Sequence, residues 1–288
     1  MTKLTVTDIT PTFGAEVEGL DPVGRLGKDD ERLLQRTFDE RGLLLFRGLL
    51  DLTPGYQNYL ASTVIGMEDA AGEGEKDDDA AYFVSNKRTG GGAPYGRLLF
   101  HSDMMWADEP FQVLTLYAVE VEEPVVPPTF TSATAVWESL PDDLRDRVDG
   151  LHAVHMTGQQ VRADEEGELL QPVRQRVQRS IKPIANPHAR TGRPILYVSQ
   201  MMTGRVAELS DRESEDLLGA LFGHLYDPAV SWTHEWRNGD LVVWDNLAIQ
   251  HARGNVEVEG PVRTLRKVIA PRSALAQRPE SPKFSRVS

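Results

Sequence analysis

The stretch that decides the fold is Ser231–His251, which reads SWTHEWRNGDLVVWDNLAIQH. Its first part alternates large rings with polar side chains, as a strand with one buried face does. The rings belong to Trp232, His234 and Trp236. Asn238-Gly239 favours the positive φ angles of a two-residue hairpin turn. We therefore expect Asp240–Trp244 to return as the partner strand, with His251 just past its end.

Patterns elsewhere predict the rest of the fold. Short apolar runs predict strands within Thr5–Glu18 and at Gly42–Phe46, Phe111–Val121, Ile195–Ser199 and Arg263–Ile269. Helical spacing and capping residues predict helices at Lys28–Glu40, Pro54–Ile65, Ala133–Leu140, Pro141–Val148 and from the Ser210 capping box to about Tyr226. Strands dominate the second half. We expect a mainly β fold with flanking helices, built on a double-stranded β-helix, or jelly roll, core whose mouth holds the site.

The size of the chain fits one domain. It has 288 residues, 40% of them hydrophobic, and shows no internal repeat or domain linker. We expect residues 1–270 to form a single domain and residues 271–288 a polar, frayed C-terminal tail. The acidic segment Glu68–Asp79 is either a solvated loop or part of a lid, over residues 68–97, because it lies just upstream of His101.

Composition excludes several classes of function. The chain has no cysteine, so any metal must be held by nitrogen and oxygen ligands. A net charge of −13 without a basic stripe argues against nucleic-acid partners. No apolar run reaches the roughly 20 residues that cross a membrane, and the first residues, MTKLTVTDIT, do not form a secretory signal. We expect a cytoplasmic protein with a small-molecule substrate, and a homo-oligomer stays open.

A metal site is indicated by His101 and Asp103, which follow the apolar run Leu98–Phe100. Residues two apart on a strand share a face, so both side chains could bind one ion. With the later His251 they would complete a 2-His-1-carboxylate triad, which holds Fe(II) and leaves the opposite positions open. The His-x-Asp triplet is a weak signal when it stands alone.

The other histidines are interpreted as structural. His152 and His155 have the i, i+3 spacing of a helical metal site, but no further ligand lies near them, so we expect surface or packing residues. His234, between two tryptophans, is expected to be a core histidine.

Two basic residues follow His251. The planar guanidinium of Arg263 suits the carboxylate of a keto acid. On a strand, Arg263 and Lys267 share a face. If Arg263 points into the barrel, Lys267 either holds an anionic substrate there or is a solvated lysine at the rim.

The chain resembles the taurine dioxygenase-like family of Fe(II)/2-oxoglutarate-dependent oxygenases. The motifs that carry the resemblance span nearly the whole chain: FGAEVEGLD (13–21), RGLLLFRG (41–48), LLFHSD (98–103), PTFTSATAVWESLP (128–141), TGRPILYVS (191–199) and WRNGDLVVWDNLAIQH (236–251). The resemblance implies Fe(II), with 2-oxoglutarate and O₂ as cosubstrates. It implies metal ligands at His101, Asp103 and His251, 2-oxoglutarate contacts from Thr129 and Arg263, and substrate contacts from Arg97, Met104 and Lys267.

The chain departs from the family pattern at three places. Val126-Pro127-Pro128 stands where Gly-Gly-Asp usually precedes the threonine, Leu247 stands where an arginine commonly follows WDN, and Lys267 replaces a second arginine. These departures prevent a transfer of taurine or herbicide specificity to this chain.

The predicted activity is that of a dioxygenase. It would couple oxidative decarboxylation of 2-oxoglutarate, to succinate and CO₂, with hydroxylation of a small, anionic or partly apolar metabolite, or with hydroxylation-triggered cleavage or desaturation. Methionines near the motifs indicate either an apolar pocket or simple packing. The alternatives are a non-oxidative metal-binding member of the barrel fold and a metal-dependent hydrolase. A hydrolase would have no use for Arg263.

Overall fold

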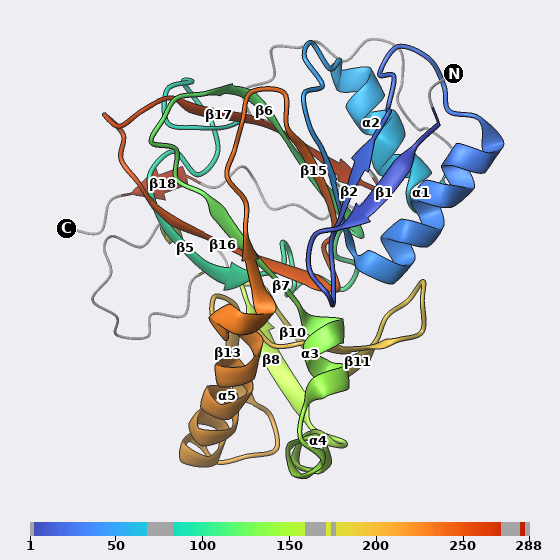
Figure 1. Ribbon diagram of the computed structural model, residues 1–288. Coiled ribbons are helices and arrows are strands. Elements are labelled where there is room, and N and C mark those ends of the chain that lie inside the picture. Colours follow the sequence, from blue (N-terminus) through green and yellow to red (C-terminus); the bar gives the residue numbers. More distant parts are fainter. Residues whose placement is uncertain (1–2, 68–82, 159–170, 174–176, 272–282, 286–288) are drawn as a thin grey trace.

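The main core of the protein lies between two β-sheets in the computed structural model, which describes residues 3–67, 83–158, 171–173, 177–271 and 283–285 (Figure 1). The major sheet contains, in spatial order, β1 (Thr5–Asp8), β2 (Ala15–Glu18), β3 (Leu43–Phe46), β15 (Leu241–Asp245), β6 (Val113–Val121), β17 (Arg263–Ala270) and β4 (Phe83–Ser85). The minor sheet contains β14 (Ser231–Thr233), β7 (Pro128–Ser132), β16 (Ile249–Val256) and β5 (Gly96–His101). The predicted mainly β fold with a jelly-roll core is thus confirmed.

Strands β3 and β15 of the major sheet are apolar on both faces because the sheet is covered on both sides there. In β3, Leu43 and Leu45 pack into the core shared with the minor sheet. Leu44 and Phe46 point the other way, into a second core. Two helices cover this outer face, α1 (Lys28–Arg41) and α2 (Pro54–Thr63) (Figure 1). A strand that is covered on both faces needs apolar residues at consecutive positions, and the run GLLLF meets this need.

Further elements extend from the end of the minor sheet, and α4 and α5 mark the lower end of the molecule in Figure 1. They are α3 (Ala133–Ser139), α4 (Asp142–Val148), α5 (Asp211–Leu225), the 3₁₀ helix η2 (Pro228–Val230), the sheet of β10 (Arg179–Pro183), β8 (His152–Met156) and β13 (Thr203–Val206), and the pair β11 (Ala185–Pro187) and β12 (Pro194–Leu196). Helix α5 begins with the predicted capping box, in which Ser210 and Glu213 bond reciprocally. No helix in the described part of the chain is long and apolar enough to cross a membrane.

The predicted hairpin at Asn238-Gly239 is wrong. Strand β14 pairs with β7 in the minor sheet, whereas β15 pairs with β3 and β6 in the major sheet. Gly239 has a positive φ of 85°, but Asn238 does not. The Asn238 side chain instead accepts a hydrogen bond from Val121 N at 2.8 Å. The segment between β14 and β15 therefore carries the chain from one sheet to the other.

Two further predictions of local structure differ from what is observed. The HAVH segment is strand β8, so His152 and His155 do not have helical spacing. The strand predicted over Ile195–Ser199 ends at Leu196.

The structure describes part of the C-terminal tail but not the acidic segment. We expected the C-terminal tail to be frayed. Its residues Lys283–Ser285 instead form β18, which pairs with β9 (Gln171–Val173). The acidic segment Glu68–Asp79 lies outside the described residues. The later part of the 68–97 segment includes β4 and the beginning of β5.

Candidate metal centre and cosubstrate site

Three side chains that can bind a metal meet at the end of β5. His101 is the last residue of β5 and pairs directly with His251 of β16. The two imidazoles therefore project from one face, with ring centroids 4.3 Å apart. Asp103 lies in the turn that follows, and its Oδ1 is 3.5 Å from His101 Nε2. The three residues each offer one ligand atom, and these atoms lie within 4.8 Å of one another.

The protonation states of these side chains suit a metal ion. His101 Nδ1 donates a hydrogen bond to Leu99 O at 2.8 Å, so the lone pair on Nε2 is available. Burial holds the pKa of His251 well below its usual range. Burial raises the pKa of Asp103, but the Lys267 ammonium, foremost among the groups that oppose it, holds that pKa well below its usual range. A neutral imidazole and an ionised carboxylate are the forms that bind metal.

The donor set fits Fe(II). Two imidazole nitrogens and one carboxylate are the ligands of the facial triad. The buried Nδ1 of His251 has no hydrogen-bond partner among the described residues, which is rare for a buried nitrogen. Phe130 and Trp244 pack against the same ring at centroid distances of 6.2 and 4.9 Å. These contacts fix the orientation of the imidazole without using its nitrogens.

Two cations of β17 point toward the interior. Arg263 is 4% exposed, and burial lowers its pKa to about 10, so it is charged at neutral pH. Lys267 forms an ion pair with Asp103 and is 18% exposed. Arg266, between them, extends the other way and donates to Gln57 of α2 at 2.7 Å. The Lys267 side chain is therefore directed at Asp103, and its contact with a substrate stays a prediction.

Arg263 lies in an electropositive part of the interior. Its Nε donates to Val126 O at 3.3 Å. The neighbouring Arg253 is also buried and donates to three backbone carbonyls, those of Ala93, Tyr95 and Gly96. Burial, and then the charge of Arg263, lowers the pKa of Arg253. Neither guanidinium forms an ion pair within the described residues, so an anion would be a favourable partner for this region.

The structure does not bring Thr129 to the metal ligands. In the register of β7 with β16, Phe130 opposes His251 and Thr129 opposes Ala252. Thr129 therefore projects from the opposite face of the minor sheet. Its hydroxyl lies 3.0 Å from that of Thr233. The contact of Thr129 with 2-oxoglutarate stays a prediction.

The remaining predicted residues flank the metal ligands. Arg97 is half-buried in β5, four positions before His101. The register of β5 with β16 shifts between Leu98 and His101, so the contact of Arg97 with a substrate stays a prediction. Met104 follows Asp103, is 6% exposed and has a φ of 57°, which is uncommon for a methionine. Met104 belongs to the core between the sheets, as do the other methionines of the pattern, Met105, Met201 and Met202. Their burial is that of packing residues.

The other histidines are structural, as predicted. His152 pairs with Glu208 at the surface. His155 is fully buried, and its Nδ1 lies 3.1 Å from the Thr203 hydroxyl. His234 is fully buried, and its Nε2 lies 3.3 Å from Oδ2 of Asp240, in the turn before β15.

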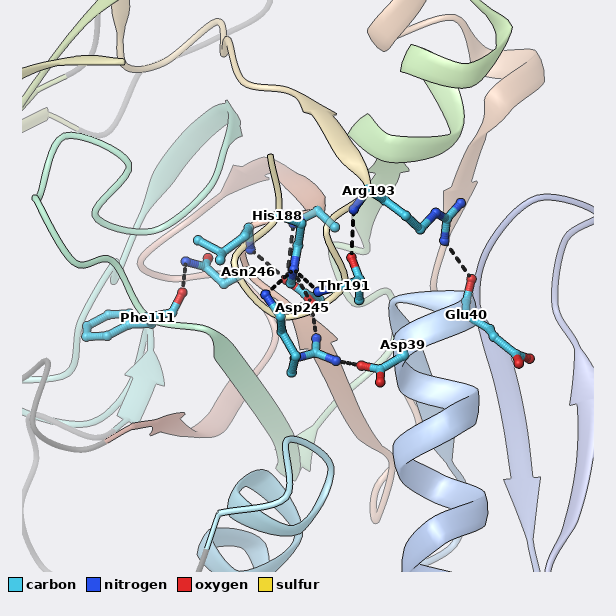
Figure 2. A network of polar contacts seen from close by, with 11 residues as sticks. Asp39, Glu40, Phe111, His188, Thr191, Arg193, Asp245 and Asn246 are labelled. Atoms are coloured by element: carbon cyan, nitrogen blue, oxygen red, sulfur yellow. Dashed lines mark hydrogen bonds and ion pairs between the residues drawn. The ribbon is translucent and has the colours of Figure 1, made fainter. Parts of the chain in front are cut away.

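The WDN motif is anchored by a buried polar network (Figure 2). Asp245 Oδ2 accepts a hydrogen bond from His188 Nε2 at 2.9 Å and pairs with Arg190, which also pairs with Asp39 of α1. The backbone N–H groups of Arg190 and Thr191 donate to His188 Nδ1. The proton of this imidazole is therefore on Nε2, directed at Asp245. The network fixes the end of β15 against α1 and the loop between β11 and β12.

Sequence reasoning assigned no role to two asparagines that contact the site. Asn246 bonds to the backbone of Asp103, and Asn86 bonds to the backbone of Arg263. Asn246 belongs to the WDN motif, which contributed to the family resemblance but did not indicate a role for this residue. Asn86 had no signal, because its partner lies 177 positions away in the chain.

The chain is similar to known dioxygenases over most of its length. Residues 5–269 match the family described as "Taurine catabolism dioxygenase TauD, TfdA family". The chain is 29% identical over 274 residues to pentalenolactone F synthase of Streptomyces arenae, with 85% of this chain and 89% of that protein covered. It is 25% identical over 275 residues to the alpha-ketoglutarate-dependent 2,4-dichlorophenoxyacetate dioxygenase of Cupriavidus pinatubonensis, with 84% and 88% covered.

Solved structures share the fold. AAD-2 in complex with Mn(II) and N-oxalylglycine has a TM-score of 0.73 at 23% identity, with 93% of this chain and 96% of that chain covered. A putative alpha-ketoglutarate-dependent taurine dioxygenase from Burkholderia xenovorans has a TM-score of 0.73 at 21% identity, with 99% and 98% covered. Since the family model spans nearly the whole chain, the protein belongs to the TauD/TfdA family of dioxygenases, which use Fe(II), 2-oxoglutarate and O₂.

Proposed function

We propose that His101, Asp103 and His251 hold the Fe(II) of this enzyme. The observation that carries the proposal is the convergence of three ligand atoms within 4.8 Å of one another, from β5, the turn after it and β16. The hydrogen bond from His101 Nδ1 to a backbone carbonyl supports it, because metal-binding histidines are usually oriented in this way. The low pKa of Asp103 supports it as well.

Arg263 is proposed to bind the distal carboxylate of 2-oxoglutarate. Its guanidinium is buried and charged, and it has no ion-pair partner within the described residues. A planar guanidinium can pair with both oxygens of a carboxylate. Thr129 enters this proposal on the family resemblance alone, because its hydroxyl faces Thr233.

When bound, Fe(II) with 2-oxoglutarate and O₂ supplies an oxidant for a substrate C–H bond, while 2-oxoglutarate becomes succinate and CO₂. The residues of the chain prepare the site for this chemistry. His101 and His251 provide nitrogen donors in a fixed orientation, and Asp103 provides the negative charge. Phe130 and Trp244 cover the His251 ring and keep water away from that side of the site.

The proposed substrate is a small metabolite that carries an acid group or is partly apolar. Lys267 supports the acid group, because its ammonium reaches Asp103 and would bring an anion close to the metal. Two relatives are named for acidic compounds, 2,4-dichlorophenoxyacetate and a sulfonate. Hydroxylation is the proposed outcome, with cleavage or desaturation as the other reactions of the same site.

Anaerobic visible absorption tests this proposal. Fe(II) and then 2-oxoglutarate are added to the metal-free protein, and the charge-transfer band of chelated 2-oxoglutarate is followed. We expect a weak band in the wild type and none in Asp103→Ala, which should keep the circular dichroism spectrum of the wild type. A band of wild-type intensity in Asp103→Ala would remove Asp103 from the ligand set. The absence of a band in the wild type would overturn the assignment of the whole site.

A further inference from the structure

Asn246 fixes the backbone of Asp103 from both sides. Its side chain is fully buried, and Oδ1 accepts a hydrogen bond from Asp103 N at 2.8 Å. Nδ2 donates to Asp103 O at 2.9 Å and to Phe111 O at 3.1 Å. An amide side chain can donate and accept in one plane, which neither a carboxylate nor a hydroxyl can do with this geometry. Asp103 lies in a turn rather than in a strand ladder, so these bonds replace the ladder that holds His101 and His251.

The position of Asn246 is itself fixed. Its backbone N–H donates to Gln112 O at 2.9 Å. The preceding residue, Asp245, is held by His188 and Arg190 in the network of Figure 2, where Asp245 and His188 point toward one another. The cavity beside this network measures about 20 Å³, which is room for about one water molecule. The network is therefore a packed support, with no space for a ligand of its own.

Asn86 makes one hydrogen bond to the backbone of Arg263 and two to the loop that precedes it. It is 8% exposed, and its Oδ1 accepts a hydrogen bond from Arg263 N at 3.0 Å. Nδ2 donates to Glu257 O at 3.1 Å and to Pro261 O at 2.8 Å. These two carbonyls belong to the loop between β16 and β17, so Asn86 closes that loop and fixes the first residue of β17.

We infer that Asn246 and Asn86 are positioning residues, each of which serves one half of the proposed site. Asn246 holds the metal carboxylate of Asp103, and Asn86 holds the guanidinium of Arg263 where it meets 2-oxoglutarate. This inference rests on the proposed function. Residues that orient a metal ligand are typically worth ~10- to 100-fold in metal affinity. The two asparagines should therefore act on different ligands, although neither touches metal or cosubstrate.

Calorimetric titrations of Asn246→Ala and Asn86→Ala test the inference without turnover. Each substitution removes three hydrogen bonds, all to backbone groups, so each variant is the matched control of the other. The probes are Mn(II) alone, and N-oxalylglycine at saturating Mn(II). We expect Asn246→Ala to weaken Mn(II) binding by ~10-fold or more and Asn86→Ala to leave it near the wild-type value. Asn86→Ala should weaken N-oxalylglycine binding by about tenfold, and more than Asn246→Ala does.

The outcomes separate this inference from the proposed function. If the wild type binds no Mn(II), the proposed metal site is wrong and the inference is wrong with it. If the wild type binds both probes but the two variants weaken both equally, or weaken neither, the asparagines are only structural and the proposed site stands. Thermal unfolding monitors folding, and where an alanine variant does not fold, Asn246→Ser and Asn86→Ser replace the pair with the same expected selectivity.

Discussion

The two sheets of the jelly roll bring different chemistry to the same interior. The minor sheet and the turn after it supply imidazoles and a carboxylate that lie next to one another and are oriented by strand register and ring packing. Strand β17 of the major sheet supplies two cations, Lys267, which reaches Asp103 of that cluster, and the buried Arg263. The three proposed metal ligands are all needed to hold the ion. Each cation of β17, in contrast, is proposed to bind a different anion. Losses in the minor sheet should therefore abolish activity, and losses in β17 should change affinities.

The largest effect is expected from His101→Ala, because it removes one of three proposed metal ligands. The variant should release no succinate from 2-oxoglutarate in the presence of Fe(II) and O₂, whatever the substrate. His152→Ala, which removes a surface histidine paired with Glu208, is the control and should keep wild-type turnover. Turnover in His101→Ala above a few per cent of the wild type would break the proposed difference between the sheets.

Arg263→Ala should have a large but graded effect. It removes a buried cation from β17 while the metal ligands stay in place. We expect the concentration of 2-oxoglutarate needed for half-maximal succinate release to rise by ~100-fold, as loss of a charge-assisted bidentate pair implies. Arg266→Ala is matched in residue type and strand, but its side chain faces Gln57 on the other side of the sheet, so the requirement should not change. Equal effects of the two substitutions would remove Arg263 from the cosubstrate site.

Strand β16 shows what could be predicted from the sequence. His251 was predicted as a metal ligand because ligand chemistry is a property of the residue and because the motifs around it match a family. Its exact neighbours were not predictable, since the pairing of His251 with His101 joins strands 150 positions apart. The capping box at Ser210 was predicted correctly because all of its bonds are local.

Failures occurred where distant partners decide the outcome. Asn238-Gly239 is a strong local signal for a hairpin, but β14 and β15 each find better partners in different sheets. The face of Thr129 depends on the register of β7 with β16, which no local pattern shows. Asn86 could not be found for the same reason. Local chemistry thus predicted the candidate ligands, and long-range pairing decided what surrounds them.

His155 is a buried histidine of strand β8, outside the two main sheets, and it can be compared with the proposed metal ligands. Burial, and then the charge of Lys182, lowers the pKa of His155 from 6.5 to about 3. The unfolded chain therefore takes up a proton below about pH 6.5 that the folded protein does not bind, so stability is full above that pH and falls as the pH drops toward 3. The slope from this residue should approach about 1.4 kcal/mol per pH unit. Urea unfolding between pH 4 and 7 should give a shallower slope for His155→Gln, and an unchanged slope would exclude this residue as its source.

The smallest effect is expected at Lys267, and its direction is informative. The Lys267 ammonium is paired with Asp103, so a bound metal ion must replace or share this partner. Removing the cation in Lys267→Met should therefore tighten Mn(II) binding several-fold, because the ion no longer competes with the ammonium for the carboxylate of Asp103. Lys267→Arg keeps the charge and should bind Mn(II) like the wild type. Weaker binding in Lys267→Met would mean that the lysine orients Asp103 for the metal, so that β17 supports the donor set instead of competing with it.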